Sequence, residues 1–254
     1  VKSDFYQLAR RQETACMKAA NAVVALSEVS KAELLDRGVS RDKITVVPNA
    51  VHDESIDRDF DRSLLRRELG LEDTFTVGTV TSIVGYEGID VLLRAVVFTP
   101  EIRVLIVGDG SSRLELEKLA KELGLSDRVL FVGQQPNESI WKWYAVLDAF
   151  VVPRRDTPVC RKVTPIKPLQ AQALGVPVIA SDLPALREIT GKFAYYFQPE
   201  QPEELANHLR RLDRHDAEEL EGGKEWAKKH TWKHNARRYK EIYRDLESFD
   251  SSNF

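Results

Sequence analysis

Short apolar runs alternate with amphipathic stretches through the middle of the chain. The apolar runs occupy residues 75–80, 104–107, 129–132, 149–152, 178–180 and 194–197. Between them lie patterns of helical period at residues 89–98, 112–123, 138–147, 168–174 and 184–189. Strands that are apolar on both faces and alternate with helices form a parallel sheet covered on both sides. The pattern therefore predicts a doubly wound α/β fold.

The amino-terminal end departs from this alternation. Residues 4–20 predict a helix, and apolar runs at 22–26 and 44–47 predict two short strands around a helix that ends at Gly38. The acidic stretch 52–63 predicts an exposed connection. Residues 1–51 are therefore expected to form a small opening unit, separate from the main domain.

The carboxyl-terminal end predicts a helical tail. Its helical patterns occupy residues 202–214, 217–229 and the segment that begins at Thr231 and Trp232. We therefore expect the main domain to span residues 52–230 and the last helix to span residues 231–254.

Composition narrows the class of protein. The chain has 254 residues, of which 43% are hydrophobic and 30% are charged, and no apolar run is long enough to span a membrane. Lys and Arg number 37 and Asp and Glu number 40, so the net charge is −3. These values exclude disorder and collagen, and they give the chain no overall attraction to nucleic acid.

The cysteines and the methionine suggest where the protein works and how complete it is. Cys16 and Cys160 lie far apart and form no Cys-x-x-Cys motif, which predicts a reducing, cytoplasmic location with no disulfide and no bound metal. The chain begins with Val1, and its single methionine, Met17, lies inside a predicted helix. We therefore expect this chain to be a piece of a longer protein.

Three loops that follow predicted strands could contact a ligand, because open parallel sheets bind ligands at the carboxyl ends of their strands. Residues 79–88 combine hydroxyl groups and glycines before a helix, which suits a phosphate or a sugar hydroxyl. Residues 108–112 lack the third glycine of a dinucleotide fingerprint, since Arg113 stands there. Residues 133–137 offer backbone groups to a planar base. For each loop, a capped turn without a ligand remains the alternative.

The loop at residues 154–167 is strongly basic. It holds five basic side chains and only one acidic side chain, a local charge of +4, and it precedes a helix that begins at Pro168. Basic side chains and free backbone N–H groups at one point suit a diphosphate, although a solvated surface loop is the alternative.

Acid–base and nucleophilic groups are scarce in these four loops. The five histidines lie in the acidic connection and in the predicted carboxyl-terminal helices. No Ser/His/Asp or Cys/His arrangement stands out. The sequence therefore leaves the catalytic residues unknown.

Several segments together resemble a known family. They are AVVALS at 22–27, ITVVPNAV at 44–51, GYEGID at 85–90, VGDG at 107–110 and KPLQAQALGVPVIASD at 167–182. In order and spacing they resemble the retaining glycosyltransferases of family 4, which have the two-domain GT-B fold. The resemblance implies that residues 1–51 end the acceptor domain and form the crossover. It also implies that residues 52–230 bind the donor and that the last helix returns to the missing domain.

The resemblance also implies roles for individual residues. The diphosphate of the donor would meet Arg161, Lys167, Thr79 and Ser82. The donor sugar would meet Lys162, Val163 and Thr164, and the ribose would meet Gln170. The nucleobase or nucleoside would meet Asp109, Gly110, Gly133 and Gln134.

Four positions depart from the family pattern. The family has glutamates where this chain has Lys162 and Gln170, and it tends to have basic residues where this chain has Thr79 and Glu87. A subgroup with Thr-Pro-Leu-Lys-Pro-Leu-Glu-Ala segments resembles this chain more closely. In that subgroup we expect Arg161 and Lys167 to supply the positive charge.

The function implied is a hexosyl-type transfer from a nucleotide-diphosphate sugar to a glycan, lipid or small molecule. The transfer would retain configuration and need no cofactor or essential metal. The expected partners are the nucleotide sugar, an unknown acceptor and the missing domain, through which a membrane could be contacted peripherally. Two alternatives remain open: a non-catalytic nucleotide-sugar-binding or scaffold module, and a sugar-nucleotide epimerase of GT-B type.

Overall fold

The computed structural model describes residues 4–56, 60–211 and 217–251. At its centre lies a six-stranded sheet in which every pairing is parallel, with the order β5-β4-β3-β6-β7-β8. The strands are β3 (Phe75–Val80), β4 (Ile102–Val107), β5 (Val129–Gly133), β6 (Ala149–Val152), β7 (Val178–Ser181) and β8 (Tyr195–Phe197). The chain moves outward from β3 to β5, returns to β6 beside β3, and then moves outward the other way. The predicted doubly wound sheet is confirmed, with its switch point between β3 and β6.

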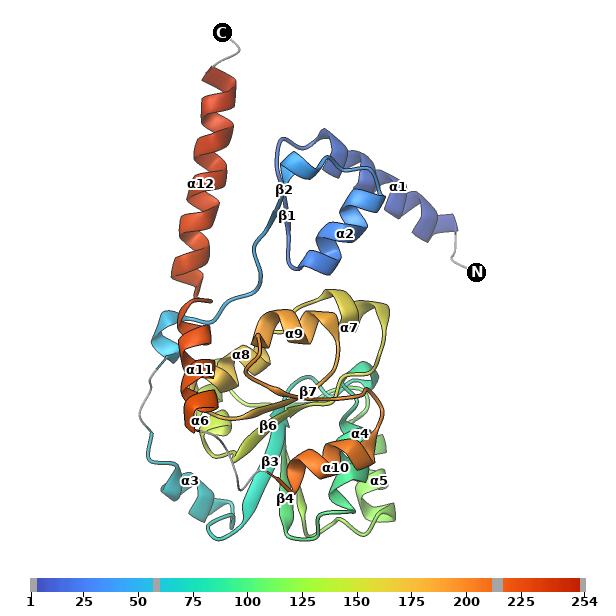
Figure 1. Ribbon diagram of the computed structural model, residues 1–254. Helices are drawn as coiled ribbons and strands as arrows, with labels where there is room; N and C mark the ends of the chain where they lie inside the picture. The colour runs from blue at the N-terminus through green and yellow to red at the C-terminus, as the bar shows by residue number, and fades with distance from the viewer. Residues whose placement is uncertain (1–3, 57–59, 212–216, 252–254) are drawn as a thin grey trace.

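Helices cover both faces of this sheet (Figure 1). One face packs against α4 (Ile89–Val96), α5 (Arg113–Glu122) and α10 (Pro202–Leu209), whose buried side chains share one core cluster with those of β3 and β4. The other face packs against α6 (Ile140–Ala145), α7 (Pro158–Lys162), α8 (Lys167–Ala173) and α9 (Pro184–Thr190). Two apolar cores, one on each face, explain why predicted strands such as 104–107 and 149–152 are apolar on both faces.

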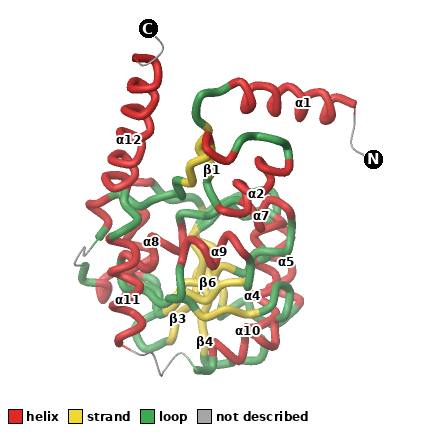
Figure 2. The backbone as a smooth tube through the Cα atoms, turned by 45° about the horizontal axis from the view of Figure 1, so that its top comes forward, coloured by secondary structure: helices red, strands yellow, loops and turns green. Residues whose placement is uncertain are grey.

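The opening unit forms a separate small layer. It comprises α1 (Asp4–Ala19), β1 (Val23–Ala25), α2 (Glu28–Asp36) and β2 (Ile44–Val46), and its two strands pair in parallel. Its own apolar core includes Ala25, Val39 and Ile44. Figure 2 shows α2 above α7 and α9, on the side of the molecule away from α10. The predicted helix and both predicted strands are confirmed here.

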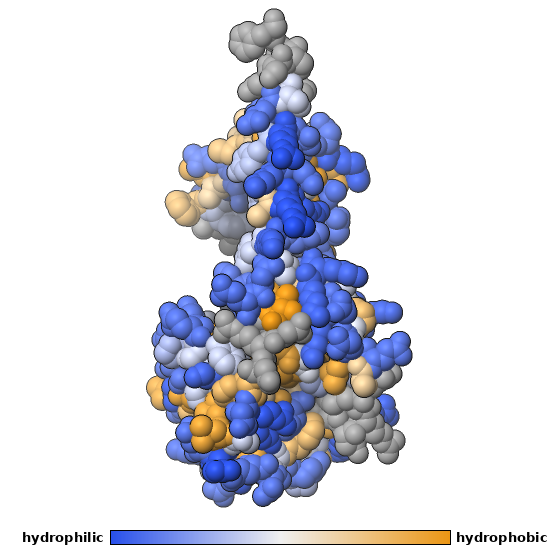
Figure 3. Space-filling view, turned by 90° about the vertical axis from the view of Figure 1, so that its left-hand side faces the viewer, coloured by the Kyte–Doolittle hydropathy of each residue, from blue (hydrophilic) through white to orange (hydrophobic). Residues whose placement is uncertain are grey.

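The carboxyl-terminal helices run from the main domain toward the level of the opening unit. They are α11 (Ala217–Lys228), which packs on α8, and the long α12 (Trp232–Ser251). Figures 1 and 3 show α12 standing out from the main domain, with a largely hydrophilic surface. At its base, Val51 donates its N–H to the His230 carbonyl at 3.0 Å and accepts one from the N–H of Trp232 at 2.9 Å. The two segments that join the opening unit and α12 to the main domain therefore lie side by side.

Two helices differ from the prediction: α7 lies within a predicted loop, and α3 (Arg62–Glu68) begins at the last two residues of the predicted connection. Helix α7 occupies the middle of the basic loop, where the Thr157 hydroxyl caps it by accepting from the Cys160 N–H. The helix predicted at residues 202–214 is α10, which ends at Leu209. Residues 212–214 of this predicted helix and residues 57–59 of the predicted connection lie outside the described residues. Short 3-10 turns complete the fold at Arg41–Lys43, Asp53–Ser55, Gly85–Glu87 and Asn137–Ser139.

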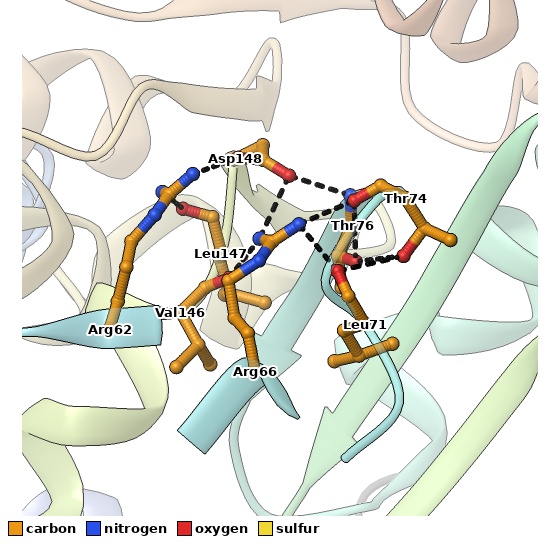
Figure 4. A network of polar contacts seen from close by, with 8 residues as sticks. All are labelled: Arg62, Arg66, Leu71, Thr74, Thr76, Val146, Leu147 and Asp148. Atoms are coloured by element: carbon orange, nitrogen blue, oxygen red, sulfur yellow. Dashed lines mark hydrogen bonds and ion pairs between the residues drawn. The ribbon is translucent and has the colours of Figure 1, made fainter. Parts of the chain in front are cut away.

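A buried arginine explains why α3 forms and where it packs (Figure 4). Arg66 is only 6% exposed. Its guanidinium donates hydrogen bonds to the carbonyls of Val146, Leu71 and Thr74 and forms an ion pair with Asp148 at 3.1 Å. Asp148 also accepts the N–H of Thr76 at the start of β3. The network fixes α3 against the amino-terminal ends of β3 and β6. Ligands are expected at the opposite, carboxyl-terminal ends of the strands. This tertiary role of Arg66 is not visible in the local sequence pattern.

The described residues contain neither a membrane-spanning helix nor a metal-binding cluster. No helix in the described ranges combines the length and the apolar character needed to cross a membrane. Among the same residues, no group of three or more His, Cys, Asp or Glu side chains is placed to hold a metal ion.

Candidate functional site

A cleft of about 470 Å³ opens at the carboxyl ends of β3 and β4, next to the switch point of the sheet. Its walls come from the loops after β3, β4 and β5 and from the amino-terminal turn of α8. The residues that line it are Val80, Thr81, Ser82, Val107, Gly108, Asp109, Gln134, Gln135, Asn137, Ile140, Tyr144, Ile166, Lys167 and Gln170. The topology therefore brings together all three of the hydroxyl- and glycine-rich loops identified in the sequence.

Close backbone packing forms the floor of the cleft. Gly108 has a φ of +134°, and a Cβ atom there would lie 1.9 Å from the Thr81 carbonyl oxygen. A Cβ atom at Gly110 would lie 2.4 Å from the Ile83 carbonyl oxygen. The Ile83 N–H donates to the Asp109 carbonyl at 2.9 Å. Gly108 and Gly110 are thus required for the contact between the first and second loops, whatever ligand binds.

Of the four residues predicted to meet the base, two line the cleft. These are Asp109 and Gln134. Gly110 packs beneath the first loop, and Gly133, with a φ of +82°, accepts the N–H of Gly108 at 2.9 Å. The Asp109 carboxylate accepts the Gly110 N–H at 2.7 Å and pairs with Arg113 at 3.2 Å. The contacts of these four residues with a base stay a prediction.

Lys167 supplies the positive charge of the cleft. Its Nζ donates to the Thr81 Oγ1 at 2.6 Å and lies 3.9 Å from the Glu87 carboxylate. Burial lowers the pKa of Lys167 below its ordinary value of 10.5, the charge of Glu87 opposes this shift, and the charge of Arg154 reinforces it. The Glu87 carboxylate is shared with Arg154, which lies closer to it at 2.8 Å, so the partly desolvated ammonium of Lys167 is suited to bind an anion.

Glu87 is already occupied by a buried partner. The Arg154 guanidinium donates to both Glu87 oxygens, at 2.8 and 3.3 Å, and the two side chains are only 9% and 5% exposed. Arg154 also donates to the Val163 carbonyl at 3.4 Å. The pair ties the loop after β3 to the loop after β6 and neutralises two charges beside Lys167.

The remaining cations of the basic loop are also paired. Arg155 contacts Asp90 at 2.7 Å and also Glu200, Arg161 pairs with Asp156 on the same loop, and Lys162 pairs with Glu33 of α2. The local charge of +4 expected from the sequence is therefore balanced by acids, most of which come from other segments.

The four residues predicted to bind the diphosphate occupy three different environments. Lys167 and Ser82 line the cleft. Thr79 is buried within β3, at 3% exposure, and Arg161 lies on the half-exposed face of α7. The structure brings Lys167 and Ser82 together and leaves Thr79 and Arg161 outside the cleft lining, so a diphosphate contact by the last two remains only a prediction.

Of the residues predicted to meet the donor sugar, Lys162 and Thr164 contact the opening unit, and none of the three, Val163 included, lines the cleft. The Lys162 carbonyl accepts the hydroxyls of Ser27 at 2.6 Å and Ser30 at 3.2 Å. Thr164 is fully buried, and its carbonyl accepts the side-chain amide of Asn49 at 2.6 Å. Lys162 and Thr164 therefore form part of the junction between the opening unit and the main domain.

Gln170, predicted to meet the ribose, lies at the back of the cleft. Its Oε1 accepts the hydroxyl of Tyr144 at 3.0 Å. Both residues also line a neighbouring cavity of about 340 Å³, together with His52 and Trp141. Residue-by-residue reasoning missed Tyr144 as a site residue. Its position two turns after the third loop was the only available signal, because the hydroxyl's partner lies 26 residues away.

The chain is similar to curated glycosyltransferases. A D-inositol 3-phosphate glycosyltransferase of Nocardioides sp. is 30% identical over 91% of this chain and 55% of the relative. A lipopolysaccharide core biosynthesis mannosyltransferase, LpsB, of Rhizobium meliloti is 29% identical over 57% of this chain and 42% of the relative. This chain therefore spans about half the length of the curated relatives it matches.

Solved structures share the fold. Anabaena HepE, crystallised with UDP and glucose, superposes with a TM-score of 0.81 at 21% identity, over 95% of this chain and 67% of that chain. Sucrose-phosphate synthase from Thermosynechococcus elongatus gives a TM-score of 0.82 at 26% identity, over 98% of this chain and 64% of that chain.

Family models cover both parts of the chain. The model described as "Glycosyltransferase Family 4" matches residues 1–55, and that described as "Glycosyl transferases group 1" matches residues 61–238. The second match spans well over half of the chain and contains the whole cleft. The protein therefore belongs to the group 1 family of glycosyl transferases.

Proposed function

We propose that the cleft binds a nucleotide-diphosphate sugar and that the protein transfers the sugar to an acceptor. The observation that carries the proposal is Lys167, a partly buried cation in a cleft at the switch point of the sheet, whose carboxylate partner Glu87 lies 3.9 Å away and is paired more closely with Arg154. The crystal structure of the fold relative HepE with UDP and glucose supports a nucleotide as the occupant. This chain would be mainly the donor-binding part of the enzyme.

The proposed roles follow from the placement of the residues. Lys167 and Ser82 would hold the diphosphate, and Gln170 would hold the ribose. As the bond from the sugar to the diphosphate breaks, negative charge grows on the leaving phosphate, and a fixed ammonium stabilises that charge. The transfer would proceed with retention, as the resemblance to family 4 implies, and without an essential metal.

Acceptor contacts would come largely from protein beyond this chain. In the curated relatives, roughly half of the length lies outside the region matched here. Catalysis needs both substrates to be held together in a closed cleft. The 254-residue chain would therefore bind a nucleotide sugar but transfer the sugar slowly, and a cytoplasmic site of action with peripheral contact to a membrane remains part of the proposal.

Calorimetric titration with UDP, GDP, ADP and their sugars tests the donor site. One of these nucleotides should bind, with most of the affinity coming from the diphosphate, and Lys167→Ala should weaken binding about tenfold or more, as expected for a charge-assisted contact. Lys118→Ala is the matched control, because Lys118 is 78% exposed on α5 and does not line the cleft.

The outcomes separate the remaining alternatives. If none of these nucleotides binds, the donor site is disproved and a scaffold module is favoured. If a nucleotide sugar binds and is epimerised without any acceptor, the protein is a sugar-nucleotide epimerase. Fast sugar transfer by this chain alone would contradict the proposal that the acceptor contacts come largely from protein beyond this chain.

A further inference from the structure

Tyr144 is held rigidly behind the cleft. Its side chain is 1% exposed, and its ring lies 5.1 Å from that of Phe150 within the apolar core beside β6. The hydroxyl lies at the edge of this core and donates to the Gln170 Oε1 at 3.0 Å. Because the ring is packed, the hydroxyl offers its proton at a fixed point.

The Gln170 side chain faces both the cleft and the core. Its amide has one acceptor oxygen and one nitrogen with two N–H donors. The oxygen accepts from Tyr144 with one of its two lone pairs, whereas the nitrogen has no hydrogen-bond partner among residues 4–56, 60–211 and 217–251. The atom of the amide that has no protein partner and can turn to a ligand in the cleft is therefore the donor nitrogen.

The opposite orientation of the amide would be costly. In the described ranges Gln170 is the only acceptor found for the Tyr144 hydroxyl. If the amide were turned round, its nitrogen would face the hydroxyl, and the buried O–H would have no acceptor. Buried donors without partners are strongly disfavoured. The tyrosine thus selects one of the two orientations.

We propose that Tyr144 is a positioning residue that fixes Gln170 as a hydrogen-bond donor toward the cleft, so that the site binds an acceptor oxygen of the nucleotide ribose. This inference rests on the proposed function, since it assumes that a nucleotide occupies the cleft. A glutamate at this position, as the resemblance leads one to expect, would present a carboxylate, which accepts only. The exchange reverses the hydrogen-bond polarity of the site and removes a negative charge.

The reversal has a chemical consequence for the ligand. A ribose hydroxyl must donate its proton to a carboxylate, but it needs only its oxygen to accept from an amide. A methyl ether keeps the oxygen and loses the proton. The site should therefore tolerate O-methylation of the ribose oxygen that it contacts, and it should respond to complete removal of that oxygen.

The first test needs no nucleotide. Tyr144→Phe, Gln170→Ala and the double variant form a thermodynamic cycle in urea unfolding. Tyr144→Phe should shift the unfolding equilibrium about two- to tenfold more in the wild-type background than in the Gln170→Ala background, the range expected for one hydrogen bond. Equal shifts in the two backgrounds would overturn the positioning role of Tyr144, whether or not a nucleotide binds.

The second test compares ribose analogues by calorimetry. The parent is UDP, or GDP or ADP if one of these binds more tightly, and each is compared with its 2′-deoxy, 3′-deoxy, 2′-O-methyl and 3′-O-methyl forms. At one of the two positions, the wild type should lose about threefold or more on removal of the oxygen and less on methylation. In Gln170→Glu, methylation at that position should become the larger loss, by about fivefold relative to the wild type.

Tyr144→Phe distinguishes a positioning role from a purely structural role, because only a positioning role predicts different effects on the affinities for the parent and deoxy nucleotides. The freed amide can turn, so affinity for the parent nucleotide should fall about two- to fivefold while affinity for the deoxy form stays unchanged. An equal loss for the parent and deoxy forms, or the same tolerance of methylation in the wild type and in Gln170→Glu, would overturn the inference. If no nucleotide binds, the proposed function is wrong, and so is the part of this inference that concerns the ribose. The unfolding cycle still tests the hydrogen bond between Tyr144 and Gln170 in that case.

Discussion

Lys162 of α7 forms an ion pair with Glu33 of α2, and this contact joins the main domain to the opening unit. Hydrogen bonding to Lys162 lowers the pKa of Glu33, although partial burial opposes the shift. The same junction contains the hydroxyls of Ser27 and Ser30, both of which donate to the Lys162 carbonyl. A position where the family resemblance leads one to expect a glutamate near the sugar thus carries a lysine that binds the other unit.

Reversing the charge of Lys162 should loosen the opening unit. In Lys162→Glu two carboxylates would face each other, so hydrogen exchange of residues 23–46 should become faster, while Lys162→Glu combined with Glu33→Lys should restore protection. The side chains are 37% and 32% exposed, so the expected effect is about 1 kcal/mol or less, measurable by exchange mass spectrometry. Arg161→Glu is the control, because Arg161 pairs within its own loop. Unchanged exchange in Lys162→Glu would show that the ion pair does not hold the junction.

The buried pair between Glu87 and Arg154 should be important for stability. Arg154→Ala leaves the Glu87 carboxylate buried without its partner, and we expect a loss of about 3–5 kcal/mol in the free energy of unfolding. Urea unfolding monitored by circular dichroism gives the measurement. Arg67→Ala, which breaks the exposed pair with Glu72, should cost about 0.5 kcal/mol or less. A similar cost for the two variants would contradict this account.

Nucleotide affinity should depend on pH through Lys167. Burial lowers the pKa of Lys167, so its charge is lost on going to alkaline pH earlier than for an exposed lysine. Affinity should therefore decline as the pH rises toward the ordinary lysine value of 10.5. Lys167→Arg should flatten this decline, since arginine stays charged. A pH profile from 7 to 10 that is the same in the two proteins would rule out Lys167 as the titrating group.

Stability of the ligand-free protein should change with pH in the opposite direction through the same group. The unfolded chain binds a proton at Lys167 more tightly than the folded chain, so the free energy of unfolding gains a contribution as the pH rises above the lowered folded pKa and up to the unfolded value. Lys167→Met should remove that contribution. Thermal unfolding between pH 8 and 10 measures it.

His230 should make the junction at the base of α12 sensitive to acid. Burial lowers the pKa of His230, the Trp226 carbonyl opposes the shift, and the nearby charges of His234, Arg238 and Lys229 reinforce it. A histidine with a lowered folded pKa contributes stability that is complete above its ordinary value of 6.5 and is lost as the pH falls below that value. His230→Gln should remove this part of the pH dependence, measured as the melting temperature between pH 7 and 5. An identical pH dependence in the variant would show that other groups are responsible.

Hydrophobic periodicity along the chain is enough to predict the layout of the main domain. The runs at 104–107 and 149–152 are apolar on both faces, and β4 and β6 contain them. Hydrophobic periodicity is a local signal, because burial of a strand on two faces or of a helix on one face imposes its period on consecutive residues. The order of strands and helices along the chain therefore indicated both the doubly wound sheet and the edge where its cleft lies.

Which polar groups remain available to a ligand depends on contacts between segments that lie far apart in the sequence. Glu87 lies 67 residues from Arg154, and Glu33 lies 129 residues from Lys162, so a count of charge along the basic loop could not include them. The same holds for Tyr144 and Gln170. Electrostatic pairing and hydrogen bonding depend on distances of a few ångströms in space, not on spacing along the chain, because both interactions weaken steeply with separation and orientation. Folding therefore turned a basic loop into a set of paired cations, and left Lys167 and the Gln170 amide in the cleft.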